Sequence, residues 1–449
     1  MIEWLDDRLG AASWARTALR KVFPDHWSFL LGEIALFCFV ILLTTGVFLT
    51  LFYRPDATPV TYLGPYEPLR GQEVSAAYES VMRLSFEVRA GMVMRQVHHW
   101  AALVFVASVV VHMARVFFTG AFRRPREVNW LVGIALLLLA LGMGFTGYSL
   151  PDDLLSGTGL RILYSVIVSV PFLGPYLAFL IFGGEFPTEG VISRLFVLHV
   201  MLLPGLIIAL IGAHLGLLWR QKHTQFPGAG RTEHNVVGKP FWPVQILKST
   251  GLMLLTAAVL AVIGGVIQIN PIWEYGPFDA TTVSAPAQPD WYMGWLEGAI
   301  RLFPPFEPTI FGVTIPASFI PGVVLPGLFF TVLALWPFIE QRMSGDYSEH
   351  HLLDYPRDQP VRTAVGVAGI LLAVILTLAG GNDVLALMFN ISVESITWFF
   401  RIAVFLVPPA GGLVAYRIAG ELGSSDLHPF KRRKGVVLRR NARGGFDET

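Results

Sequence analysis

Cysteine and charge are what this 449-residue chain has least of. A single cysteine, Cys38, excludes an internal disulfide, a cysteine-built zinc site and an iron–sulfur cluster held by cysteines. Only 14% of the residues are charged, against about a quarter in an ordinary soluble domain, and 33 basic residues balance 32 acidic ones. A chain with so few and such balanced charges is not expected to bind nucleic acid.

Apolar residues fill the place of the missing charges. They make up 54% of the chain, and the mean hydropathy is +0.58. About 20 consecutive apolar residues suffice to cross a bilayer as a helix. Eight runs approach or exceed this length: 27–52, 91–120, 129–150, 195–219, 247–269, 321–339, 361–380 and 396–416. The sequence therefore predicts an all-α integral membrane protein with eight transmembrane helices.

A ninth apolar stretch, 162–183, is not expected to cross the membrane. It contains Pro171, Gly174 and Pro175, which interrupt a helix. With eight spans and the N-terminus inside, the inner segments carry about three times as many lysines and arginines as the outer ones, as the positive-inside rule requires. We therefore expect one or two helices on the outer surface here. The first apolar run is too long for a signal peptide, so we expect no cleavage.

A polar segment, 220–246, divides the chain into two parts. Four spans are expected in 1–219 and four in 247–416, with a basic tail, 417–449, on the inner side. The tail is either solvated, in contact with lipid headgroups, or bound to a partner.

Four histidines lie inside two predicted spans, where ionisable groups are costly and mark functional sites. His98 and His112 are 14 residues apart in the second span, and His199 and His214 are 15 apart in the fourth. These separations correspond to about 21 Å of helix and return the second side chain to within about 40–60° of the first. Because both spans follow outer loops, His98 should face His199 near the outer side and His112 should face His214 near the inner side. Two such bis-histidine levels predict two haems forming an electron path; hydrogen-bonded packing histidines are the alternative.

Glycines recur with the same period on the neighbouring spans. Gly32 and Gly46 in the first span, and Gly133 and Gly147 in the third, are each 14 residues apart. A missing side chain at two depths leaves room for a large flat cofactor, although glycine also serves helix packing.

Two arginines lie three residues from the histidines of the second span, on the sides nearest the interfaces. Arg95 precedes His98, and Arg115 follows His112. Both are candidates for haem propionates, and Arg115 equally for extending to water. His99 points elsewhere on the helix, where we expect it to make a hydrogen bond.

These motifs resemble the cytochrome b subunit of cytochrome bc-type quinol:cytochrome c reductases over nearly the whole chain. The resemblance rests on RQVHHW at 95–100, residues 111–130, GYSLPDDLLSGTG at 147–159, the histidine pairs and PDWY at 289–292. PDWY in place of the usual PEWY is similar to the actinobacterial, menaquinol-oxidising branch. The spacing of 15 in the fourth span is similar to the plastid type.

The resemblance implies a role for each site. His98 and His199 would bind a low-potential b-type haem, and the other histidine pair a high-potential one. At the outer quinol site Asp290 would accept a proton and Tyr292 would add a hydrogen bond. Asp152 and Asp153 are alternative acceptors, although capping a loop is favoured for them.

The inner quinone-reduction site is matched more loosely. Its candidates, which equally suit lipid headgroups, are Arg220, Lys222, His223 and Asp25. Cys38 aligns with a cysteine that tethers an additional haem in plastid-type relatives. Packing as a small apolar residue is favoured for it, and a third haem stays open.

The implied reaction needs partners. One electron of a quinol, here menaquinol, would leave toward a Rieske iron–sulfur subunit, and the other would cross the membrane to reduce a quinone, with proton translocation. A c-type cytochrome subunit, a homodimer, membrane lipid and a terminal oxidase supercomplex are expected from the resemblance. The chain would lie in a bacterial plasma membrane with both termini in the cytoplasm.

Two other functions remain open. A haem-bearing membrane anchor of a dehydrogenase or hydrogenase would need only four or five spans and no PDWY-like loop. A proton-coupled transporter with a histidine relay usually has two related halves, and no such repeat stands out here.

Overall fold

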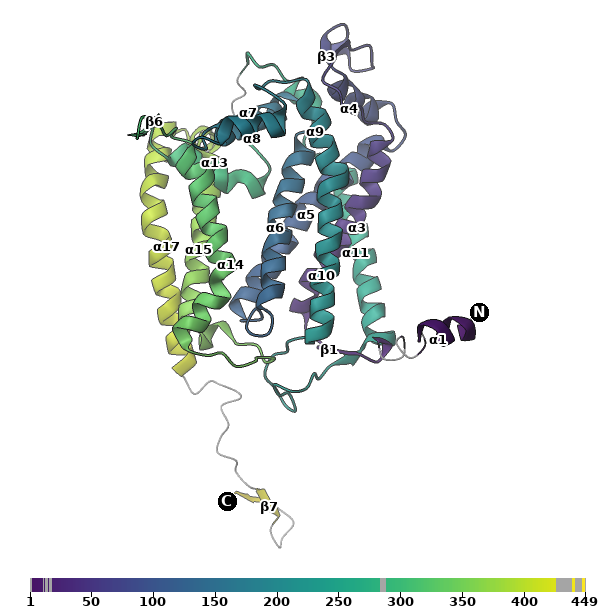
Figure 1. Cartoon of the computed structure of the whole chain (residues 1–449), viewed down its shortest axis with the longest axis vertical. Coiled ribbons are helices and arrows are strands. Elements are labelled where there is room, and N and C mark those ends of the chain that lie inside the picture. Colours follow the sequence, from purple (N-terminus) through teal and green to yellow (C-terminus); the bar gives the residue numbers. More distant parts are fainter. Residues whose placement is uncertain are drawn as a thin grey trace.

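The computed structural model describes residues 2–10, 12, 15, 18–282, 288–424, 438–440 and 446–448. Within them, eight helical segments are long and apolar enough to cross a membrane, which confirms the predicted number. They are Trp27–Thr50, Gly91–Phe118, Glu127–Tyr148, Gly190–Gln221, Phe241–Val266, Ile320–Ser344, Pro360–Gly380 and Val393–Gly423. These segments stand side by side as a bundle (Figure 1).

The α-helices within these segments keep the labels of Figure 1. They are α3 (Leu30–Thr50), α5 (Gly91–Phe118), α6 (Glu127–Tyr148), α9 (Gly190–Val197), α10 (Leu203–Gln221), α11 (Ile246–Val266), α14 (Leu325–Ser344), α15 (Pro360–Gly380) and α17 (Val393–Ser424). Single π-helical turns at Leu198–Leu202 and Ile320–Val324 precede α10 and α14. The residues before α11, Phe241–Gln245, include Trp242, whose backbone is extended.

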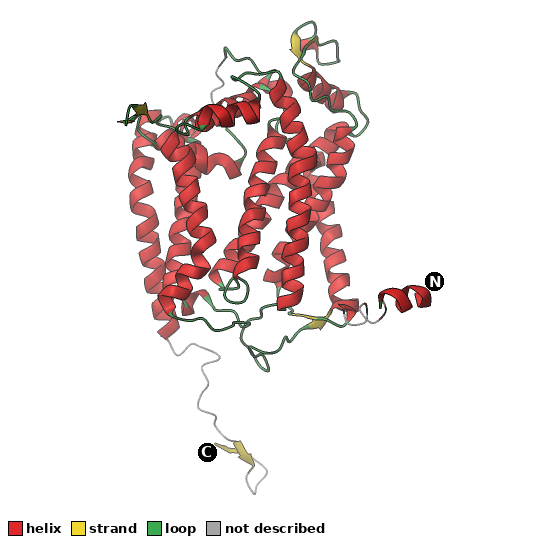
Figure 2. Ribbon diagram, viewed as in Figure 1, coloured by secondary structure: helices red, strands yellow, loops and turns green. Residues whose placement is uncertain are grey.

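Most of the shorter helices lie at the ends of the bundle (Figure 2). The helices are α1 (Ile2–Leu9), α4 (Ala76–Phe86), α7 (Leu154–Val168), α8 (Gly174–Phe182), α12 (Ile272–Tyr275), α13 (Gly294–Leu302) and α16 (Asn382–Phe389). Single 3-10 turns lie at Trp27–Phe29, Glu67–Leu69, Trp291–Met293 and Pro356–Asp358. The described strands form four antiparallel pairs: β1 (Val22–Phe23) with β4 (Lys239–Pro240), β2 (Pro59–Thr61) with β3 (Glu73–Ser75), β5 (Thr309–Ile310) with β6 (Val313–Thr314), and β7 (Leu438–Arg440) with β8 (Phe446–Glu448).

The ninth apolar stretch forms two helices across one end of the bundle, as expected (Figure 1). α7 ends at Val168 and α8 begins at Gly174, so the break falls around Pro171. We call the end that carries α4, α7 and α8 the outer end, and the end that carries α1 and β1 the inner end.

The last span is longer than its apolar run. α17 continues to Ser424, beyond residue 416, because Arg417 and Glu421 lie where the helix approaches the inner end and polar side chains reach water. Most of the lysine- and arginine-dense part of the expected tail lies outside the described residues.

Two groups of helices pack against each other. α3, α5, α6, α10 and α11 share one buried apolar cluster, with Phe39, Phe105 and Ile207 among its members, and α11 contacts both α3 and α5. α15 packs between α13 and α17 and also touches α5, while α14 contacts α6. The fifth span thus packs with the first four.

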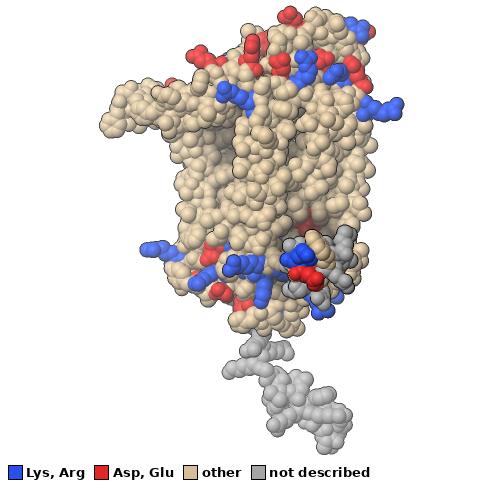
Figure 3. All heavy atoms as spheres, turned by 45° about the vertical axis from the view of Figure 1, so that its right-hand side comes forward, with Lys and Arg blue, Asp and Glu red and all other residues tan. Residues whose placement is uncertain are grey.

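Buried arginines tie the inner loops together. Arg126 donates to the carbonyls of Gln221, Lys222 and His350 at 3.1, 3.0 and 2.7 Å. Charged side chains gather in two bands, one at each end, with an uncharged belt between them (Figure 3). A bilayer core would occupy that belt, since charges there are costly.

Candidate functional site

The four histidines form two pairs of nearly equal geometry. The ring centres of His98 and His199 are 6.3 Å apart with planes at 70°, and those of His112 and His214 are 6.4 Å apart at 74°. Two metal–imidazole bonds of about 2.0 Å and the radii of the two five-membered rings, about 1.1 Å each, together span about 6 Å. Each pair is therefore spaced to hold one metal ion between its rings.

A π-helical turn accounts for the unequal spacing of the two pairs along the chain. His199 lies in the π turn Leu198–Leu202, and His214 lies in α10. Since a π turn accommodates one additional residue, the 15-residue step from His199 to His214 is equivalent to the 14-residue step in the straight α5. Both histidines of each helix thus meet their partners at matching depths.

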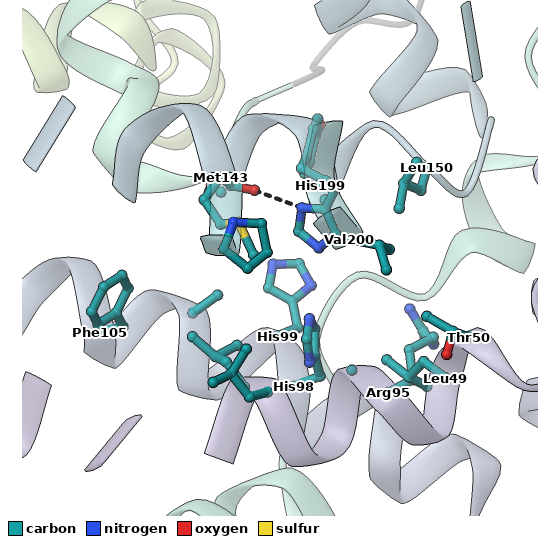
Figure 4. Close-up of a pocket in the computed structure, with 18 of the residues that line it drawn as sticks. Leu49, Thr50, Arg95, His98, His99, Phe105, Met143, Leu150, His199 and Val200 are labelled. Atoms are coloured by element: carbon teal, nitrogen blue, oxygen red, sulfur yellow. Dashed lines mark hydrogen bonds between the residues drawn. The ribbon is translucent and has the colours of Figure 1, made fainter. Parts of the chain in front are cut away.

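Hydrogen bonds fix the outer rings in one tautomer. His98 Nδ1 lies 2.9 Å from the hydroxyl of Thr45, and His199 Nδ1 lies 3.1 Å from that of Thr146. Each hydroxyl donates its own hydrogen to a carbonyl of its helix, so it accepts from the ring N–H. His199 Nδ1 also faces the carbonyl of Met143 at 3.1 Å (Figure 4). Both Nε2 atoms are then left without a proton, which is the form that binds a metal.

Each predicted glycine lies against one of the histidines. A Cβ atom would stand 3.1 Å from His112 at Gly32 and 3.3 Å from His98 at Gly46. The distance would be 3.9 Å from His214 at Gly133 and 2.5 Å from His199 at Gly147. The glycines therefore admit the rings at both levels.

Both arginines that were predicted to bind haem propionates have guanidinium nitrogens without a hydrogen-bond partner among the described residues. Arg95 is buried and donates from Nη1 to the carbonyl of Asn270 at 3.0 Å, but its Nε and Nη2 have no hydrogen-bond partner within the described residues. The same two atoms of Arg115 also lack one there, and its guanidinium lies 4.3 Å from the centre of the Phe29 ring. Buried unpaired guanidinium donors fit the propionates of a haem.

One cavity joins the outer histidine pair to the predicted quinol site. Its lining includes His98 and His199, on opposite sides in Figure 4, and also His99, Asp290 and Tyr292. The Tyr292 hydroxyl donates to Asp290 Oδ2 at 3.0 Å. His99 Nε2 lies 3.0 and 3.1 Å from the two Asp290 oxygens, so the hydrogen bond expected for His99 is present. Its partner, 191 residues away, was not foreseen because no local pattern links them.

Comparisons with known proteins agree with this geometry. The family profile described as "Cytochrome b(N-terminal)/b6/petB" matches residues 103–277. The chain is 53% identical over 425 residues to the cytochrome bc1 complex cytochrome b subunit of Mycobacterium tuberculosis (strain ATCC 25618 / H37Rv), covering 94% of this chain and 77% of the relative. The chain belongs to the family of cytochrome b subunits of bc1 complexes.

Other relatives extend this result. The subunit of the same description from Streptomyces coelicolor is 49% identical over 451 residues, covering 99% of this chain and 82% of the relative. That of Corynebacterium diphtheriae is 52% identical over 422 residues, covering 94% and 78%. A solved chain of "Hyperthermophilic respiratory Complex III" has the same fold, with a TM-score of 0.67, 22% identity and coverage of 93% and 100%. The resemblance inferred from the motifs is confirmed.

The two aspartates of the second outer loop, after the third span, lie at the start of α7 in this cytochrome b subunit. Asp153 is the N-cap of α7 and forms a capping box with Ser156. Burial raises its pKa to about 6. Asp152 adopts a left-handed backbone with φ of 54°, and burial raises its pKa to about 6 against the lowering effect of the Ser75 hydroxyl. The capping expected for Asp153 is confirmed.

The inner candidates of the subunit make different contacts. Asp25 pairs with Lys248 of α11 at 2.6 Å, and both side chains are about half-exposed. Lys222 lines a small pocket with Glu233 and His351. The His223 ring lies 4.4 Å from that of Phe23. Its pKa is lowered to about 4, chiefly by burial and then by nearby cations.

Arg220 is exposed at the end of α10. Cys38 is fully buried within the apolar cluster shared by the first five spans. This environment favours the packing role of its thiol.

Proposed function

We propose that this subunit holds two b-type haems and oxidises a quinol, menaquinol, at its outer end. The observation that carries the proposal is the pair of matched bis-histidine sites, with ring centres 6.3 and 6.4 Å apart. Two nitrogen ligands from the protein leave no open position for oxygen on a haem iron. When bound, the haems would supply a path for electrons between the two levels.

The residues around the histidines have distinct tasks in this proposal. Thr45 and Thr146 orient the outer rings, the four glycines admit them, and Arg95 and Arg115 neutralise propionates. Arg95 lies near the outer end of α5 and would bind the propionates of the outer haem. Arg115 lies near the inner end of the same helix and would bind those of the inner haem.

Asp290 accepts a proton from the quinol in the outer cavity. Oxidation of a quinol releases two protons with two electrons, and a carboxylate within hydrogen-bond reach serves as the base. Burial, and then the nearby Asp290 carboxylate, raise the pKa of Tyr292, so the phenol stays protonated and donates to Asp290.

The electrons take two routes. One leaves at the outer end toward a Rieske iron–sulfur subunit and a c-type cytochrome subunit, because one cysteine cannot supply either cofactor site. The other crosses to the inner end and reduces a quinone near some of the inner candidates, Arg220, Lys222, His223 and Asp25. We place the outer end outside a bacterial plasma membrane, in a dimeric complex that also binds lipid and a terminal oxidase.

Spectroscopy tests the cofactor content. We expect a dithionite-minus-ascorbate difference spectrum of the complex, purified from native membranes, to show two b-type haems per copy of this chain. A denaturing gel stained for haem peroxidase activity should show no band at the 49.6 kDa of this chain. A stained band there would assign a third haem to Cys38. Absence of any b-type spectrum would contradict the proposal and leave the proton-coupled transporter.

Replacement of the proposed base tests the reaction. We expect Asp290→Asn to lower quinol-dependent reduction of the c-type partner about 100-fold while both haems remain. Unchanged activity would contradict the role of Asp290.

A further inference from the structure

His99 contacts the proposed base from a different element of the fold. It follows His98 in α5, and one residue turns the side chain by about 100° about the helix axis, away from the histidine pair. Its ring reaches Asp290, at the start of the 3-10 turn Trp291–Met293. The side chains of His99 and Asp290 are each only 14% exposed, so water competes little for this contact.

The chemistry of the carboxylate fixes the direction of the hydrogen bonds. An ionised Asp290 only accepts, so His99 Nε2 carries a hydrogen and shares it between the two oxygens at 3.0 and 3.1 Å. Tyr292 donates to Oδ2 at 3.0 Å. Donors from two elements thus hold the carboxylate, and Asp290 keeps further lone pairs for a third donor in the cavity.

We infer that His99 is a positioning residue, which holds the Asp290 carboxylate in the outer cavity in the orientation that accepts the quinol proton. The inference rests on the proposed function of Asp290. An aspartate places its carboxylate close to the backbone, where rotation about χ1 moves it away from the cavity as a whole. The His99 hydrogen bond opposes that rotation, and misplacement of a reacting group by about 1 Å costs up to about 100-fold in rate.

A purely structural role makes a different prediction. His99 would then only fasten the 288–294 segment to α5, as its neighbour Trp100 fastens the segment after α11 by donating from Nε1 to the carbonyl of Ile267 at 2.9 Å. Trp100→Phe is therefore a matched control. It removes one hydrogen bond from the adjacent residue of the same helix, without changing a contact of Asp290.

The test compares two replacements of His99 in the intact complex. His99→Leu removes the donor at similar size, whereas His99→Gln keeps an N–H that reaches a similar position. We expect His99→Leu to lower kcat for a soluble menaquinol analogue about tenfold with KM changed less than about twofold, His99→Gln to recover most of the loss, and Trp100→Phe to retain activity. Both b-type haems should remain in every variant. Equal losses in the two His99 variants, or loss of a haem in both, would overturn the inference.

A double-variant cycle separates this inference from the proposed function. If His99 acts through Asp290, His99→Leu should lower the residual rate of Asp290→Asn by less than about twofold. A further tenfold loss of rate when His99→Leu is added to Asp290→Asn would overturn the positioning role of His99 while leaving Asp290 as the base. Full activity of Asp290→Asn alone would instead overturn the proposed function, and the inference with it.

Discussion

The outer and inner histidine pairs have the same ring geometry and different surroundings. At the outer level, Thr45 and Thr146 precede the two glycines and bind the ring N–H groups. At the inner level the residues before the glycines are Leu31 and Val132, which have no hydroxyl. His112 Nδ1 is buried without a hydrogen-bond partner in the described part of the chain. The residue before each glycine is thus one difference between the two levels.

This difference has an electronic consequence. An acceptor at the ring N–H raises the basicity of a metal-ligating imidazole, which favours the oxidised metal. The outer level, with two such acceptors, should therefore have the lower potential. This is the order that carries an electron inward, from the outer pair to the inner pair.

Loss of a histidine ligand should have the largest effect on the haem bound at its level. We expect His199→Leu and His214→Leu each to reduce the haem content from two to one per chain and to abolish quinol-dependent electron transfer, since an iron left with one imidazole is poorly held. A pyridine haemochrome assay measures the content. Redox titration should show only the higher-potential component in His199→Leu and only the lower one in His214→Leu. Retention of both haems in either variant would refute its assignment as a ligand.

Replacement of the third-span glycine at each level should have very different effects, because Gly147 lies much closer to its histidine than Gly133 does. A Cβ at Gly147 would lie 2.5 Å from His199, so the ring must move by about 1 Å to reach ordinary contact. At Gly133 the distance to His214 would be 3.9 Å, already an ordinary contact. We expect Gly147→Ala to lose most of the lower-potential haem and Gly133→Ala to keep the higher-potential one, as measured by redox titration. Equal losses of haem in the two variants would mean that the bound cofactor, rather than the His214 ring, leaves no room for a side chain at Gly133.

Removal of the threonine hydroxyls should change only the outer potential. Thr45→Val and Thr146→Val keep the side-chain shape, and each removes one hydroxyl that accepts from a ring N–H. His199 Nδ1 still has the Met143 carbonyl as an acceptor, so Thr45→Val should have the larger effect. Since one hydrogen bond is worth about 1 kcal/mol and a tenfold change in a one-electron equilibrium is about 59 mV, we expect the lower potential to rise by some tens of millivolts. The inner haem of the same protein is the internal control. An equal shift of both potentials would point to a general change of the bundle.

The sequence was sufficient for the parts of the structure that repeat along a helix. Apolar run lengths predicted the eight spans, and Pro171 predicted the break between α7 and α8. The 14-residue periods placed histidines and glycines at common depths, because helical rise and rotation are regular.

Features that depend on irregular backbone or on distant contacts were not predictable in this way. A π turn has no periodic signature, so the 15-residue spacing of His199 and His214 left an angular mismatch that the fold resolves. The contact of His99 with Asp290 depends on how an outer loop packs against α5. The pairing of Asp25 with Lys248 likewise joins residues that are far apart in the sequence.

The smallest expected effect concerns how the stability of the inner end depends on pH. The pKa of His223 is lowered from its usual 6.5 to about 4, chiefly by burial and then by Lys21, Arg126 and Arg115. The folded chain therefore binds fewer protons than the unfolded chain between these values, and stability is lost as the pH falls below 6.5. At pH 5 this amounts to at most about 2 kcal/mol. The variant His223→Phe keeps a ring beside Phe23. We expect its melting temperature to fall by a few °C less than that of the unchanged protein when the pH is lowered from 7.5 to 5. A large loss in the rate of quinone reduction by the same variant at pH 7 would assign the ring a direct contact with the quinone.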